Sequence, residues 1–170
     1  MSSRGDGLAL VLKAAAPTLI GALGAILLAL PLRFGYGVLP TPVFPLIVVF
    51  FWTLYGPSYL PAPSVFAIGL LQDFLSGGPL GLWALVYLVA QFIVLSQRSY
   101  FTGREPGVVW AGFAFAAAGV SIIVWLVMSL MSGVMLPLLG LLYQMAATVG
   151  CFPLFRRAFA YLHRRVIVES

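Results

Sequence analysis

Residues 108–131 read VVWAGFAFAAAGVSIIVWLVMSLM and contain no charged side chain. A helix of about 20 apolar residues crosses the ~30 Å hydrocarbon core of a bilayer, so this stretch predicts a transmembrane helix. Two further apolar runs, residues 14–32 and 136–155, have a comparable length. The three runs together predict an all-α integral membrane protein.

The composition excludes a soluble domain. Hydrophobic residues make up 62% of the chain and charged residues only 8%, whereas about 25% of residues are charged in soluble domains. The sequence therefore predicts one membrane domain, residues 14–155, between a short N-terminal segment, residues 1–13, and a basic amphipathic tail, residues 156–170. The single cysteine, Cys151, excludes an internal disulfide and a metal site of paired cysteines.

Three shorter apolar runs complete the domain. Residues 80–96 end in polar Ser96, are followed by Gln97 and Arg98, and predict a fourth span. Residues 42–55 and 61–75 are joined by residues 56–63, which contain a glycine and three prolines that cannot continue a helix. They form either two short spans or one re-entrant hairpin. We prefer two spans and hence a bundle of six transmembrane helices.

The orientation of the bundle follows from its basic residues, because Lys and Arg in short loops stay in the cytoplasm. With six spans, one side of the membrane carries eight basic residues and the other carries one. The eight are Arg4, Lys13, Arg98, Arg104, Arg156, Arg157, Arg164 and Arg165, and the one is Arg33. Both termini are therefore expected in the cytoplasm, with either arrangement of residues 42–75.

The segment GLLQDFLSGGPLG, residues 69–81, is the most informative motif. Its acid, Asp73, adjoins a hydrophobic run, where an ionisable group is costly and suggests a function or a specific partner. One interpretation is that Asp73 accepts hydrogen bonds from the backbone N–H groups of residues 76–78 or caps the next helix. The other is an ion pair, for which Arg33 is the natural partner on the same side.

Polar side chains at membrane depth are few. Gln72, Gln91 and Gln144 either join helices by hydrogen bonds or share a ligand pocket, and helix joining is the preferred interpretation. Three pairs of small residues four positions apart permit close approach of helices. These pairs are Gly21 with Ala25, Gly112 with Ala116, and Ala146 with Gly150.

No catalytic or metal-binding set is recognisable, and we expect neither an enzyme nor a cofactor. The only histidine, His163, lies among arginines beyond the last apolar run, too far from Cys151 or Asp73 to act as their base. The tail, residues 155–168, places apolar residues on one helical stripe, which predicts an interfacial helix. Its arginines, Arg156, Arg157, Arg164 and Arg165, are expected at lipid phosphates rather than on nucleic acid. The alternative is that the tail is a docking site for a cytoplasmic partner.

The middle of the chain, residues 41–97, resembles the bacterial rod shape-determining protein MreD family. The resemblance lies in Phe51-Trp52, the proline-rich break, and an Asp-x-x-Ser-Gly-x-x-x-Gly core. It places Asp73, Ser76, Gly77, Leu80 and Gly81 in the family motif, together with the intervening Gly78 and Pro79. Gln72 stands at a position that is often apolar in the family.

The resemblance implies a non-catalytic subunit of the cell-elongation complex in the bacterial cytoplasmic membrane, which scaffolds peptidoglycan synthesis. The implied partners are MreC, MreB, and RodA with its transpeptidase, besides membrane lipids. It also implies a six-helix fold similar to the substrate-binding subunits of energy-coupling-factor transporters. The alternative function is therefore a small-molecule-binding subunit of a vitamin-type transporter.

Overall fold

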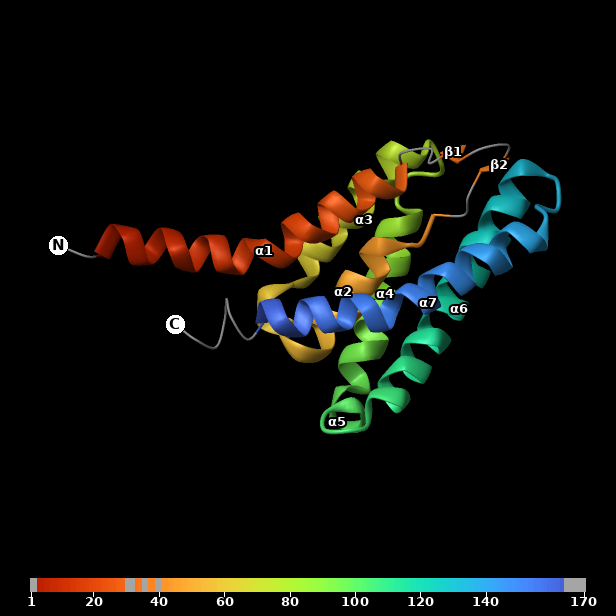
Figure 1. Ribbon diagram of the computed structural model, residues 1–170. Helices are drawn as coiled ribbons and strands as arrows, with labels where there is room; N and C mark the ends of the chain where they lie inside the picture. The colour runs from red at the N-terminus through yellow and green to blue at the C-terminus, as the bar shows by residue number, and fades with distance from the viewer. Residues whose placement is uncertain (1–2, 30–32, 35–36, 39–40, 164–170) are drawn as a thin grey trace.

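The computed structural model is almost entirely helical in the residues that it describes (Figure 1). It describes residues 3–29, 33–34, 37–38 and 41–163, with side chains described within 15–29 and 41–159. The helices are α1 (Ser3–Ala29), α2 (Phe44–Tyr55), α3 (Ala62–Ser76), α4 (Leu82–Ser96), α5 (Arg98–Phe101), α6 (Pro106–Ser132) and α7 (Leu138–His163). A two-residue ladder, β1 (Arg33–Phe34) with β2 (Gly37–Val38), lies in the α1–α2 link.

Helix α2 lies at the centre of the molecule, and residues 45–54 are all buried. Its aromatic side chains join it to the last two helices, because the Phe50 ring meets Phe113 of α6 at 5.2 Å and Phe152 of α7 at 5.6 Å. The 12 residues of α2 rise by only about 18 Å at 1.5 Å per residue, so α2 is shorter than the hydrocarbon core. It is therefore a core helix that the longer helices enclose.

Glycines allow the helices around α2 to approach closely. A Cβ at Gly69 of α3 would lie 2.3 Å from the Cα of Ala84 in α4, so the two backbones are in contact there. A Cβ at Gly21 of α1 would lie 2.5 Å from the Cδ1 of Ile68. Helices α1, α3 and α4 thus form one tightly packed group.

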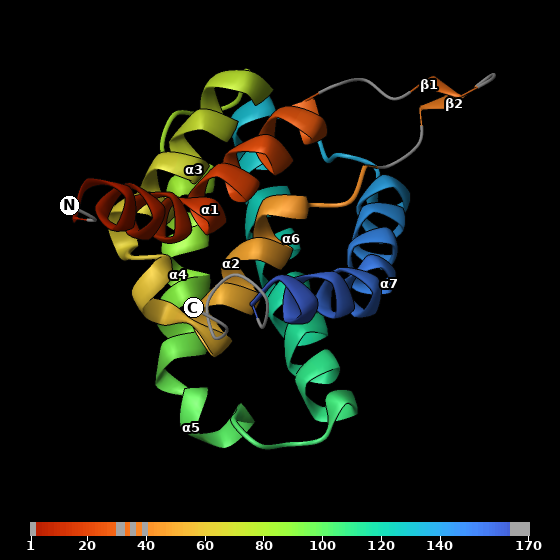
Figure 2. The same ribbon diagram turned by 60° about the vertical axis from the view of Figure 1, so that its left-hand side comes forward.

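Helices α6 and α7 form an antiparallel hairpin on the other flank of α2 (Figure 2). Only the segments Pro106–Ser132 and Leu138–Phe159 are both long and apolar enough to cross a membrane within the described residues. In the most apolar 18 residues of each segment, only 17% are buried in the first and 11% in the second. Their remaining surface is apolar and faces outward, as expected of helices in contact with lipid.

Tryptophans hold this hairpin together at both ends. Pro153 lies inside α7 and has no N–H, so the carbonyl of Val149, four residues earlier, lacks its helical donor. The Nε1–H of Trp110 in α6 donates to that carbonyl at 3.0 Å. At the other end, Trp125 Nε1–H donates to the carbonyl of Leu136 at 3.0 Å.

The connections between helices alternate between two ends of the molecule. Arg98 Nε donates to the carbonyl of Leu54 at 3.0 Å, so the α2–α3 link and the α5 loop lie together. This end of the molecule contains Arg98 and Arg104, and we call it the basic end. At the other end, a Cβ at Gly78 would lie 3.3 Å from Cε of Met128. The α3–α4 turn, residues 77–81, is thus near the end of α6, and we call this the turn end (Figure 1).

Candidate functional site

The carboxylate of Asp73 binds the first turn of α4. Its Oδ2 accepts hydrogen bonds from the backbone N–H of Gly81 at 2.9 Å and of Ala84 at 3.4 Å, and its Oδ1 accepts one from Trp83 at 2.9 Å. The side chain is 1% exposed. Backbone N–H groups at the start of a helix have no partner within the helix, and a negative charge is stabilised there. Asp73 therefore supplies, from α3, the cap that α4 lacks.

The turn between the helices is built to permit this contact. Gly77 at the end of α3 has φ +64° and Gly81 at the start of α4 has φ +92°, a left-handed conformation that favours glycine. The Oγ–H of Ser76 donates to the carbonyl of Asp73 at 3.3 Å. Gly69 lies one turn before Asp73 and brings α3 against α4 at Ala84. Gly69, Asp73 and the turn thus form a single helix–helix joint.

The remaining motif residues differ in exposure. The carbonyl of Pro79 accepts a hydrogen bond from the N–H of Leu82 at 3.3 Å, which closes the turn, whereas Leu80 is exposed. None of the side chains that the structure describes forms an ion pair with Asp73. The side chain of Arg33, the predicted ion-pair partner, lies outside the described residues.

Each of the three glutamines bonds to a different neighbour. Tyr87 of α4 donates its hydroxyl hydrogen to Gln72 Oε1. Gln91 Nε2 donates to the carbonyl of Leu60 at 2.8 Å, and Gln144 Nε2 donates to the carbonyl of Thr41 at 3.2 Å. All three hydrogen bonds join separate elements.

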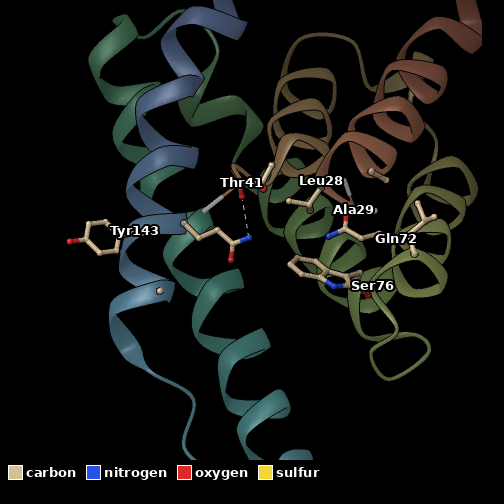
Figure 3. Close-up of a pocket in the computed structure, with 11 residues that line it drawn as sticks. Leu28, Ala29, Thr41, Gln72, Ser76 and Tyr143 are labelled. Carbon is tan, nitrogen blue, oxygen red and sulfur yellow. Dashed lines mark hydrogen bonds between the residues drawn. The ribbon is translucent and has the colours of Figure 1, made fainter. Parts of the chain in front are cut away.

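Two of the glutamines also line one cavity of about 570 Å³, and Gln91 does not. The cavity lies between α1, α3 and α4 on one side and α7 on the other (Figure 3). Its walls are formed by Ala25, Leu28, Ala29, Thr41, Gln72, Leu75, Ser76, Trp83, Gly140, Tyr143 and Gln144.

The apolar stripe of the tail begins by packing within the molecule. Phe155 meets Phe44 with ring centroids 5.3 Å apart, and Phe159 meets Phe51 at 5.4 Å. Arg156 is half-buried and Arg157 is exposed. Arg164 and Arg165 lie outside the described residues, so the lipid contacts expected for the tail stay a prediction.

Sequence reasoning missed the residues that act over long separations. Thr148 is buried, and its Oγ accepts a hydrogen bond from the N–H of Val43 at 3.0 Å, which fixes α7 to the start of α2. Thr148 stands four residues after Gln144, a spacing that could have linked the two on one face of α7. Pro153 within an apolar run could likewise have indicated that the carbonyl of Val149 lacks its helical donor. The sequence does not indicate that Trp110 donates to this carbonyl.

Metal ligands do not gather in the part of the chain that the structure describes, since no group of three His, Cys, Asp or Glu residues forms there. Cys151 is half-buried within α7. Asp73 already accepts three backbone hydrogen bonds. The site is therefore a structural joint beside a cavity.

A family model described as rod shape-determining protein MreD matches residues 12–156. This match includes the α3–α4 joint, both walls of the cavity and most of α7. Neither a curated protein nor a solved structure matches the chain.

Proposed function

The chain belongs to the rod shape-determining protein MreD family, and from this membership we propose that it is a non-catalytic scaffold of the rod-shape complex. The family is one of membrane proteins that determine cell shape. In this proposal the chain binds partner membrane proteins and positions peptidoglycan synthesis. The proposed partners are MreC, MreB, and RodA with its transpeptidase.

We further propose six transmembrane spans with both termini in the cytoplasm. The alternation of connections between the basic end and the turn end supports this arrangement, because α3, α4 and α6 each run from one end to the other. Arg98 and Arg104 lie at the basic end, which would face the cytoplasm. Helix α2 is shorter than the hydrocarbon core, but its ends can lie at membrane depth because the helix is buried in protein.

One observation favours the binding of a partner helix at α7. Two of the small-residue pairs serve contacts within the chain, because Gly21 lies against Ile68 and Gly112 against Phe101. The third pair, Ala146 and Gly150, is exposed on α7, and a Cβ at Gly150 would meet no atom within 4 Å. A small-residue pair on an outward face allows a second helix to approach closely in a membrane.

A Gly150→Phe variant tests this proposal, because a bulky ring would hold a partner helix away without disturbing the chain itself. Gly119→Phe on α6 is the matched control, since Gly119 is exposed and also has open space around its Cβ. Tagged variants should be purified from cells in mild detergent, and the membrane proteins that come with them quantified by mass spectrometry. We expect Gly150→Phe to lose a rod-shape partner and to give rounded cells.

Equal partner recovery from the Gly150→Phe and Gly119→Phe variants, at equal levels in the membrane, would contradict a partner helix on this face of α7. The vitamin-transporter alternative receives no support from the family model or from the other comparisons.

A further inference from the structure

The side chain of Gln72, which lines the cavity between α3 and α7, carries a hydrogen-bond donor that the described residues do not use. Gln72 is 2% exposed, and its Oε1 accepts from Tyr87. Its Nε2 has no hydrogen-bond partner among the residues that the structure describes. Figure 3 shows the Gln72 side chain directed into the space between α3 and α7. A ligand that accepts the hydrogen bond of this amide donor therefore gains affinity.

The rest of the wall selects the kind of ligand. Among the described residues that line the cavity there is no Asp, Glu, Lys, Arg or His. A charged group would lie there without a counter-ion, so the part of the ligand inside must be uncharged. Ala25, Leu28 and Leu75 offer apolar surface beside the amide of Gln72. The wall thus suits an alkyl chain that carries an uncharged oxygen acceptor.

The position of the cavity identifies the source of such a ligand. Ala29 is the last residue of α1 and Ser76 the last of α3, so the cavity lies at the turn end. Gln72 stands about 6 Å inside the end of α3 at 1.5 Å per residue. The indole of Trp83 also lines the cavity, and tryptophan is enriched where membrane helices meet the polar interface. This is the depth at which the ester groups of a phospholipid join its acyl chains.

The cavity is open enough to admit a lipid from the side. Leu75 is 42% exposed and Tyr143 is 58% exposed on opposite walls, and Figure 3 shows the Tyr143 ring turned away from the cavity. Its volume of about 570 Å³ falls among ligand pockets, which measure about 300–1,000 Å³.

We propose that this cavity binds the ester region of a membrane phospholipid. An ester carbonyl accepts the hydrogen bond of Gln72 Nε2, one acyl chain packs on Ala25, Leu28 and Leu75, and the charged headgroup stays outside. This lipid site is separate from the partner face at Ala146 and Gly150, and it does not depend on the proposed scaffold function.

The test uses the full chain in nanodiscs of phosphatidylethanolamine and phosphatidylglycerol that contain a trace of phosphatidylglycerol with a diazirine in one acyl chain. After irradiation, mass spectrometry locates the crosslinked residues. Gly140→Phe narrows the cavity, because Gly140 lines it and has open space at its Cβ. Gly150→Phe places the same ring on the same helix away from the cavity. Circular dichroism confirms that both variants fold.

Crosslinks should concentrate on residues 25–28 and 75 in the wild type and in Gly150→Phe, and should be lost in Gly140→Phe. Competition with unlabelled lipids measures the contribution of the ester carbonyl to binding. A diether phosphatidylglycerol has the same chains and headgroup as the diester but has no ester carbonyl. The diester should compete about 3- to 10-fold better than the diether, the worth of one hydrogen bond. In a Gln72→Leu variant the two lipids should compete equally.

Equal crosslinking of the cavity residues in Gly140→Phe and Gly150→Phe would overturn the proposal, as would crosslinks spread evenly over the lipid-facing helices. Equal competition by diester and diether lipids in the wild type would refute the role of Gln72. If Gly140→Phe instead abolished recovery of a partner protein while lipid crosslinking was unchanged, the cavity would be a protein-binding groove.

Discussion

Replacement of Asp73 by Asn should destabilise the protein although the two side chains have the same shape. Both carboxylate oxygens accept backbone hydrogen bonds, Oδ2 from Gly81 and Ala84 and Oδ1 from Trp83. Asn keeps one acceptor oxygen and places an NH₂ group at the other position. That NH₂ group would face a backbone N–H, so at least one hydrogen bond is lost and one buried donor is left without a partner.

The magnitude follows from these contacts. A hydrogen bond to a charged acceptor contributes about 1.5–3 kcal/mol, and a charge at a helix N-terminus about 0.3–1 kcal/mol. Asp73→Asn should therefore lower the free energy of unfolding by about 2–4 kcal/mol, and the melting temperature by roughly 5–15 °C for a chain of this size. Asp73→Glu should retain part of the stability, since its carboxylate still reaches some of the donors.

Thermal unfolding in detergent can be followed with a thiol-reactive dye, because Cys151 is the only cysteine and is half-buried. Glu105→Gln is the matched control: Glu105 precedes α6 as an exposed N-cap whose side chain makes no capping hydrogen bond. A melting temperature of Asp73→Asn equal to that of Glu105→Gln would refute the capping account. If partner recovery were nevertheless lost, the charge would act on a partner, as the ion-pair interpretation of the sequence expected.

Three further variants test other parts of the structure. Trp110→Phe should lower the free energy of unfolding by about 1–3 kcal/mol, because it leaves the carbonyl of Val149 without a donor. In a Pro153→Ala background, α7 regains its own N–H donor and the loss should be smaller. An unchanged loss would contradict the hydrogen bond between Trp110 and Val149. Gly69→Ala should destabilise by more than the ~1 kcal/mol typical of a point mutation, because its Cβ would overlap the α4 backbone, and a wild-type melting curve would argue against that close contact. Ser58→Cys with Cys151→Ala should react with a membrane-impermeant thiol reagent only from the cytoplasmic face; complete protection from both faces would support a re-entrant hairpin instead of six spans.

Some helices could be predicted because their apolar runs are bounded by proline and glycine. Helix α5 and residues 3–13 of α1 could not, because they carry charged residues and lie outside the apolar runs. The run at residues 61–75, for example, corresponds to Ala62–Ser76 in the structure. The burial of each helix could not be predicted, since a helix that faces lipid is as apolar as one in the core. Residues 44–55 form the enclosed centre, yet nothing in their composition separates them from the outward-facing α6.

The importance of Asp73 could be inferred from its cost in a membrane, and helix capping was one of its two expected roles. Its donors could not be identified, because they lie 8 to 11 residues further along the chain, beyond a turn whose shape depends on two left-handed glycines. The glutamines posed the same difficulty. Their partners Tyr87, Leu60 and Thr41 lie 15, 31 and 103 residues away, distances that no local pattern reveals.

The claim that α7 presents a binding face for a partner helix is tested most directly inside cells. A photoactivatable amino acid at Ala146, which is exposed beside Gly150, should form a crosslink to a membrane protein of the rod-shape machinery. The same amino acid at Phe115, which is exposed on α6, provides the comparison and should react mainly with lipid. A protein crosslink that is specific to Ala146 and disappears in the Gly150→Phe background is the predicted result. Lipid adducts alone at Ala146, as at Phe115, would contradict the account.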